Sequence, residues 1–231
     1  SPYSFYGLGS LKFKGTVENR SMGGISVYSD SIHINLRNPA SYTGTNLALY
    51  NNEARPVKFA LGTSFSSTTI ETSTASDSYS NSAIDYLAVA LPLNKFGLGF
   101  GVLPYSSVGY NLQSRNENND LQYRYRGEGG INRAFVGLGY QVSKNLKIGV
   151  DTQYNFGNIS NTSIAFGYND FGELLQFQSR EVNRSDLGGF SFNFGTIFNK
   201  KINNSIELMV AASYSPEASI TSKNQSEFST I

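Results

Sequence analysis

The sequence contains no cysteine, no tryptophan and a single histidine, His33. With one histidine and no cysteine, zinc sites of the usual kind are excluded. Basic and acidic residues nearly balance, at 18 against 17, which argues against a nucleic-acid-binding surface. Only 15% of the residues are charged, which is low for a soluble domain. No apolar run reaches the roughly 18 to 20 residues of a spanning helix, which excludes an inner-membrane protein.

What the sequence does contain is repeated alternation of apolar and polar residues. In LKIGVDTQYNFG, residues 146–157, one parity is almost entirely apolar and the other is polar or glycine. A period of two is typical of an extended strand with two different faces. Seven such segments occur, at residues 57–65, 86–93, 96–103, 134–142, 146–157, 189–198 and 206–214.

The connections between these segments alternate in length. Short links fall at residues 94–95, 143–145 and 201–204, and long links rich in serine and asparagine at 66–81, 106–130 and 158–188. Short turns on one rim and long loops on the other are typical of outer-membrane barrels. Greek-key sandwiches instead mix hairpins with crossovers.

The polar parity indicates which face meets the surroundings. Glycine dominates it in two segments, whereas an exposed sandwich surface is expected to carry few glycines. A closed barrel tolerates small interior residues. The sequence therefore predicts an all-β protein, a transmembrane antiparallel β-barrel whose apolar face meets lipid, with a soluble β-sandwich as the alternative. Residues 55–231 would form the strands. Residues 1–54, which alternate poorly, would form an N-terminal hatch or plug in the barrel mouth.

Few side chains indicate chemistry. A Ser-His-Asp hydrolase would need His33 as its base, and His33 lies in the hatch rather than on a strand near the outer rim, so we expect neither an enzyme nor a cofactor. Acidic residues on the predicted loop tips could hold Ca²⁺, but without a compact Asp-x-Asp loop a solvated rim is favoured. These residues are Asp77, Glu117, Asp120, Asp170 and Glu173. We expect the lumen charges to pair with one another or with Arg20 and Arg37 of the hatch. They are Lys58, Lys147, Asp151 and Glu207.

The segment LQYRYRGEGG, residues 121–130, has two interpretations. Its tyrosines and arginines could bind lipopolysaccharide phosphates or a partner protein, or the segment could be a hairpin extension of the barrel. The apolar parity changes from odd at Tyr125 to even at Val136. A change of parity predicts one inserted residue, and we place this bulge at residues 127–130.

The stretch SMGGISVYSDSIHINLRNPAS, residues 21–41, resembles the hatch of FadL/TodX-type outer-membrane proteins, the long-chain fatty acid transporter family. The matching residues are Met22, Gly23, Gly24, Ser29, Asp30, Asn38, Pro39 and Ala40. GFGVLPYSSVGYNL, residues 99–112, is similar to the third strand of Bacteroidetes-type members. The resemblance implies a 14-stranded barrel with an N-terminal hatch. It also implies that hydrophobic molecules leave through a lateral opening beside a kinked third strand.

Two features of the residues bear on these implications. Pro104 cannot donate to a sheet and belongs at an edge or bulge, and Gly109 would permit a bend. Alternatively, Pro104 ends the membrane-spanning part of its strand. Seven strands are half of 14, and an odd number of antiparallel strands does not close into an ordinary even barrel. We therefore expect either the N-terminal half of a longer barrel or a second chain that completes the wall.

Two functional hypotheses follow, both in the outer membrane of a Gram-negative bacterium. The first is a channel for passive uptake of small hydrophobic, fatty-acid-like compounds. The alternative is a barrel that does not transport and serves as a subunit of an outer-membrane secretion or assembly complex. The expected partners are outer-membrane lipid and lipopolysaccharide, a hydrophobic small molecule or other protein subunits, and not nucleic acid. A ligand-sized apolar pocket between hatch and wall would favour transport, and a filled lumen would favour the subunit.

Overall fold

The computed structural model describes residues 2–27, 30–45, 49, 52–53, 56–71, 76–169 and 171–231, excluding the side chains of residues 2, 3, 77 and 79. Within these residues no helix is long and apolar enough to span a membrane. The elements are η1 (Pro2–Phe5), β1 (Ser10–Leu11), α1 (Val17–Ser21), η2 (Pro39–Tyr42), β2 (Lys58–Glu71), β3 (Ser76–Leu93), β4 (Phe96–Arg115), β5 (Leu121–Gln141), β6 (Leu146–Ala165), β7 (Ser179–Lys201), β8 (Glu207–Tyr214) and β9 (Thr221–Thr230).

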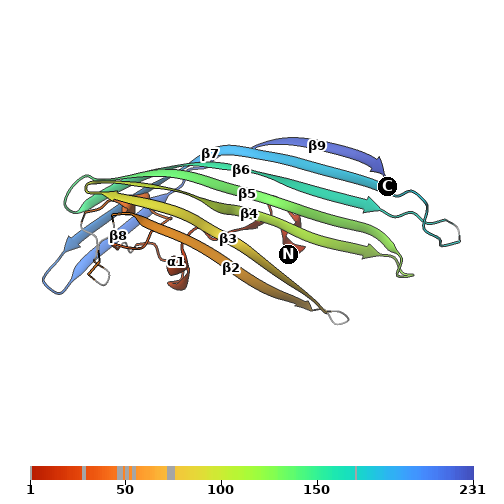
Figure 1. The fold of residues 1–231 in the computed structure, drawn as a ribbon, viewed down its shortest axis with the longest axis horizontal. Coiled ribbons are helices and arrows are strands. Elements are labelled where there is room, and N and C mark those ends of the chain that lie inside the picture. The colour runs from red at the N-terminus through yellow and green to blue at the C-terminus, as the bar shows by residue number, and fades with distance from the viewer. Residues whose placement is uncertain are drawn as a thin grey trace.

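All nine strands belong to one antiparallel sheet, in the order β2-β3-β4-β5-β6-β7-β8 with β1 beside β4 and β9 beside β7. Figure 1 shows the strands curving together, with the N-terminal elements on the concave side of the sheet. The described residues thus form an all-β, curled half-barrel, and they show neither a closed 14-stranded barrel nor a second sheet of a sandwich. β8 pairs with residues 194–201 of β7 and β9 with residues 179–188, so the two form one interrupted edge strand.

The predicted long loops are largely wrong, because the strands continue through them. β4 ends at Arg115 and β5 begins at Leu121, while β6 ends at Ala165 and β7 begins at Ser179. β9 likewise lies in the polar C-terminal stretch, where no strand was predicted. Serine, threonine and asparagine occupy both faces in these parts, so they lack the strong alternation that indicates a strand.

The apolar parity does face outward next to the short turns. Phe59 and Leu138 are 62% and 56% exposed, whereas Asp151 and Asn193 on the concave face are 1% and 2% exposed. We call the outward apolar residues of this part the apolar band. It covers residues 58–65, 87–93, 96–102, 134–140, 146–156, 190–198 and 208–214. β6 contributes residues 146–156 to it, close to the roughly 9 to 11 residues of a membrane-spanning strand.

Beyond the band the strands continue as a second part, which we call the polar extension. It comprises residues 66–71, 76–83, 106–115, 121–131, 158–165, 179–188 and 221–230. Here the apolar side chains face the concave side instead and form a cluster of their own. Its buried members are Val108, Tyr110, Ile131, Ile159 and Leu187.

The predicted bulge at residues 127–130 is wrong. β5 pairs with β6 from Tyr123 to Gln141 without a shift of register, so its odd residues keep to the concave face. The apolar residues change faces while the backbone runs straight through. The shift lies in β4, where pairing with β5 passes from Pro104 to Ser106. β4 continues to Arg115, so no loop begins at Pro104, and whether Pro104 ends the membrane-spanning part of the strand stays a prediction.

Candidate functional site

The N-terminal segment, residues 2–45, packs into the concave face, and η2 is its most deeply buried part. Asn38 caps η2, because its Oδ1 accepts a hydrogen bond from the Ala40 N–H at 3.1 Å, and Pro39 stands at the first helical position. The Asn38 amide Nδ2 also donates to the Thr196 carbonyl oxygen on β7 at 3.1 Å. Asn38, Pro39 and Ala40 are all buried. The structure thus brings these predicted hatch residues together against the wall.

The wall that receives η2 is made of glycines on neighbouring strands. A Cβ atom at Gly97 would lie within 3.0 Å of the Tyr42 carbonyl, one at Gly149 within 3.0 Å of the Ala40 nitrogen, and one at Gly195 within 3.0 Å of the Asn38 side chain. Real Cβ atoms essentially never approach other atoms so closely. Glycine is therefore required for the close approach of the two backbones. The wall glycines are Gly97, Gly99, Gly137, Gly139, Gly149 and Gly195.

Amide and carboxylate groups complete the contact. Asn193 on β7 donates through Nδ2 to Asp151 Oδ2 at 3.1 Å and to the Arg37 carbonyl at 3.3 Å. Tyr42 is 2% exposed and lies near Asp151. Burial, and then the Asp151 charge, raise the pKa of Tyr42 well above its ordinary value, so its hydroxyl keeps its proton. At η2 the concave face therefore combines polar contacts with close backbone packing.

The predicted pairing of the lumen charges with arginines is wrong. The Lys58 ammonium donates to the carbonyl oxygens of Asp30, at 2.5 Å, and His33, at 3.3 Å. Arg37 donates to the Gly24 carbonyl oxygen at 2.6 Å, and its guanidinium lies over the Phe13 ring. Backbone carbonyl oxygens of the N-terminal segment, rather than carboxylates, thus accept the hydrogen bonds of these basic side chains. Lys147 and Asp151 are buried as expected, whereas Glu207 is exposed.

The remaining hatch residues shape the loop that follows α1. Gly23 and Gly24 have φ values of +69° and +86°, and the Gly24 N–H donates to the Asn19 carbonyl oxygen at 2.7 Å, which ends α1. Asp30 Oδ1 accepts the backbone N–H groups of Ile32 and His33, at 2.9 and 2.6 Å. Burial alone would raise the pKa of Asp30, but the hydrogen bonds from His33 and Ile32 hold it below its ordinary value. Ser29, the other matching residue, lies outside the described residues.

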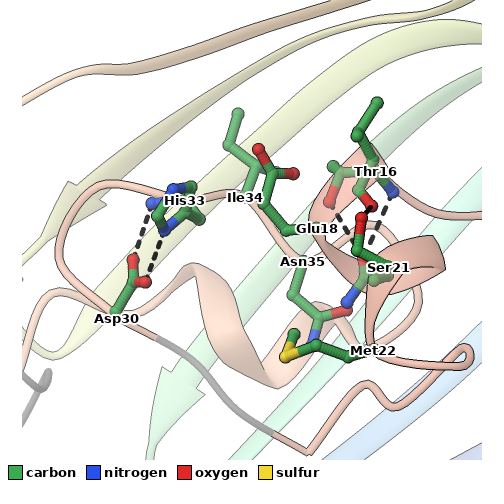
Figure 2. Close-up of a pocket in the computed structure, with 10 residues that line it drawn as sticks. Thr16, Glu18, Ser21, Met22, Asp30, His33, Ile34 and Asn35 are labelled. Carbon is green, nitrogen blue, oxygen red and sulfur yellow. Dashed lines mark hydrogen bonds and ion pairs between the residues drawn. The ribbon is translucent and has the colours of Figure 1, made fainter.

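A mainly apolar pocket of about 360 Å³ lies between α1 and residues 30–35. Figure 2 shows Asp30 and His33 facing each other on one side, with Thr16, Ser21 and Met22 on the other. Asp30 Oδ2 and His33 Nδ1 are 2.5 Å apart. The residues that line this pocket come from the N-terminal segment and not from the strands. It is therefore not the pocket between hatch and wall that transport would favour.

The two residues of the predicted lateral opening lie on β4 and have different roles. The register shift directly follows Pro104, as expected for a proline at a bulge. The Gly109 φ is not positive, and its N–H donates to Ser4 Oγ at 3.1 Å, so Gly109 anchors the N-terminal segment. A lateral opening for hydrophobic molecules stays a prediction.

The predicted acidic rim does not form a metal site where it is described. Asp120 Oδ2 accepts from Asn116, and Glu173 Oε2 from Asn169. Asp170 and the Asp77 side chain lie outside the described residues. Among the described residues, no three histidine, cysteine, aspartate or glutamate side chains gather as a metal site would need.

A comparison with protein families settles the kinship of the chain. The family model named BamG matches residues 1–231, the whole chain. The chain belongs to the BamG family. No curated protein and no solved structure gave a match.

The BamG match corrects the resemblance to the FadL/TodX family, because the two families are distinct. The Asn-Pro-Ala element that carried the resemblance is a helix cap packed on a glycine wall. Such a cap needs only its residue types and can occur in unrelated barrels. The BamG family is associated with the outer membrane of Gram-negative bacteria, which confirms the predicted localisation.

Several residues of this site were missed in the sequence. Tyr42 and Leu36 are buried on the concave face, and the Tyr86 hydroxyl accepts a hydrogen bond from the Val17 N–H at 3.1 Å. The wall glycines did give a signal, since they share the inward parity on adjacent segments. The segment that packs on that wall, η2, gave no signal of this contact, because contacts between distant segments leave no local pattern in the sequence. The division at residues 54 and 55 lies outside the described residues and stays a prediction.

Proposed function

We propose that this chain is a non-transporting structural subunit of a complex that assembles outer-membrane barrels. The observation that carries the proposal is the direct contact of η2 with the backbone of the glycine wall. A channel for hydrophobic compounds needs free space between plug and wall, and at η2 the described residues of the two are in contact. The membership of the BamG family supports the same choice.

The edges of the sheet need partners where they cross the membrane. β2 forms one edge and β8 with β9 the other, and within the described residues each pairs with a strand on one side only. Unpaired backbone groups in the bilayer cost several kcal/mol each. Strand pairing at these edges is therefore required in the membrane. The proposal assigns the chain no catalytic reaction and no cofactor.

Depletion of the protein in its native cells tests this proposal. We expect the folded fraction of several unrelated outer-membrane barrels to fall, measured by their heat-dependent migration in gels. Purification of the tagged protein in mild detergent should recover other outer-membrane subunits in a fixed ratio.

The transport alternative is tested in parallel. Vesicles containing the purified protein should take up a fluorescent long-chain fatty acid no faster than protein-free vesicles. Faster uptake, together with unchanged levels of folded barrels after depletion, would overturn the proposal.

A further inference from the structure

β3 and β4 stop pairing at the end of the apolar band that borders the polar extension. We call this place the seam. The two strands pair only from Leu87 to Leu93 and from Phe96 to Val102. Directly beyond this pairing both strands are irregular. β3 leaves Asp85 out of register with β2, and β4 leaves Tyr105 out of register with β5. Bulges bend and twist a strand, so two of them at one level separate the strands.

The N-terminal segment enters this seam and places a lysine in it. β1 pairs with β4 through Ser10 with Ser107 and Leu11 with Ser106. The backbone N–H of Lys12 donates to the Tyr105 carbonyl oxygen at 2.9 Å. Lys12 lines two cavities, and Pro104 lines both of them. The first is also lined by residues between 13 and 20 of the N-terminal segment, and the second by outward residues of β6. Lys12 therefore lies at the seam, between the cavity beside the N-terminal segment and the cavity beside the outward residues of β6.

The outer of these cavities is a hollow of about 530 Å³. Ile84 and Phe156, which line it, are 64% and 37% exposed, so the hollow opens outward. Its floor lacks side chains. The residues there are Gly129, Gly130 and Gly157, at each of which a Cβ would lie within 3.0 Å of a backbone oxygen. The close contact of these backbones creates the depression.

The chemistry of the lining favours an anionic, hydrogen-bonding group. Among the described residues that line the hollow, Lys12 is the one ionisable side chain. Ser106 is 3% exposed and pairs with Ile131, so its side chain lies on the concave face and not in the outward hollow. The other polar lining residues are Asn81, Ser82, Ser107, Asn132 and Asn158.

The position of the hollow favours a lipid as the source of that group. Phe156 ends the β6 part of the apolar band and Asn158 begins the polar extension, while Ile84 and Asn132 lie between the two parts on β3 and β5. This boundary is the level of lipid headgroups. A lipid there would place its acyl chains along Ile84 and Phe156 and its phosphate at Lys12.

We propose that the outward hollow at the β3–β4 seam binds the phosphate group of an anionic outer-membrane lipid through Lys12. The proposal requires only the outer-membrane location and is independent of the role in barrel assembly. It differs from a lateral opening, because the lipid binds from the membrane side and nothing passes through the wall.

Native mass spectrometry of the whole protein in detergent tests this site. The protein is titrated with phosphatidylglycerol and, in parallel, with diacylglycerol of the same acyl chains. Lys12→Gln should reduce the phosphatidylglycerol-bound fraction about tenfold, as expected for the loss of a charge-assisted hydrogen bond, and leave diacylglycerol binding unchanged. Ser106→Ala, which changes a side chain on the concave face, should have no effect on the lipid. Lys223→Gln, which removes the same charge from the exposed edge strand β9, is the matched control and should have no effect.

Three outcomes would overturn the proposal. One is equal phosphatidylglycerol binding by the Lys12 and Lys223 variants. The second is equal sensitivity of phosphatidylglycerol and diacylglycerol to Lys12→Gln. The third is complete displacement of the lipid by inorganic phosphate, which would assign the site to free phosphate. Retention of the lipid in excess phosphate supports the proposal. Heat-dependent gel migration of each variant shows that it has folded.

Discussion

The apolar band and the polar extension are built from the same strands, yet their faces carry opposite chemistry. In the band of β5, Val136 and Leu138 face outward and glycines face inward. In the extension of the same strand, Arg126 and Glu128 face outward and Ile131 is buried on the concave side. The backbone does not change between them. The difference is what we expect if lipid contacts the outer face of the band and water contacts that of the extension, because the surrounding medium then selects which parity is apolar.

The concave faces also differ. In the band the inner face packs by close backbone contact with η2 at the wall glycines, and beside this contact it carries an apolar cluster that contains Leu36, Tyr86 and Phe135. In the extension the outer face meets water, so the inner face carries an apolar cluster. Phe5 of η1 packs there, with its ring 5.1 Å from that of Tyr110. One N-terminal segment thus meets two kinds of wall.

The largest effect is expected at the wall glycines of the band, because only glycine lets η2 approach the strands so closely. Gly149→Val would drive a Cβ into the backbone of Pro39 and Ala40, and backbone atoms cannot move aside cheaply. We expect a loss of about 4 kcal/mol or more in unfolding free energy, measured by urea titration in detergent. The matched control is Gly109→Val in the extension, where a Cβ would meet nothing within 4 Å. Equal losses in both variants would contradict the wall contact.

The next prediction compares the outer faces along a single strand. Phe192 in the band and Val182 in the extension share the even, outward parity of β7. Phe192→Arg places a charge at the level of the acyl chains and should cost about 2–4 kcal/mol. Val182→Arg meets water and should cost less than about 0.5 kcal/mol. Refolding of both variants into lipid vesicles, followed by urea titration, checks the difference, and similar costs would mean that the band does not face lipid.

A smaller effect separates packing against protein from packing against lipid. Ile131→Val removes one methylene from the buried cluster of the extension and should cost about 0.5–1.5 kcal/mol. Ile148→Val removes the same group from the outer face of the band, where acyl chains fill the space, so the cost should be near zero. Urea titration in the same vesicles measures both. A larger cost at Ile148 than at Ile131 would reverse the assignment of the two faces.

This contrast also explains what could be predicted from the sequence. Each predicted segment coincides with one of β2 to β8, because a lipid-facing strand alternates sharply, as residues 146–157 do. Residues 121–130, interpreted as a possible hairpin extension, do lie in β5. The rest of the extension was not predicted, because its outer face is polar and its inner face is only intermittently apolar. In residues 158–165, Ile159 and Ile164 even fall on opposite parities. The strand β9 has neither signal.

Part of the site was predicted from the sequence, but one of the reasons for the prediction was wrong. Asn38, Pro39 and Ala40 were selected through a resemblance to a family to which the chain does not belong. Their burial follows instead from an N-terminal cap and a proline that suit a tight turn against a flat wall. The inward glycines gave an independent signal in the sequence. That η2 is the segment they receive could not be derived, because the contact with β7 spans 158 residues.

The smallest expected effect concerns the charge of Asp30, whose carboxylate accepts hydrogen bonds within the N-terminal segment. Because hydrogen bonds hold the pKa of Asp30 below its ordinary value of 3.8, the ionised carboxylate stabilises the folded state. This contribution is fully present above the ordinary pKa and is lost as the pH falls through the lowered, folded-state value. Asp30→Asn should therefore lower the urea midpoint at neutral pH, and its difference from the parent protein should shrink toward low pH. Midpoints measured between about pH 3 and pH 7 check this. A difference that stays constant with pH would show that the Asp30 side chain acts through its shape and hydrogen-bond geometry rather than its charge.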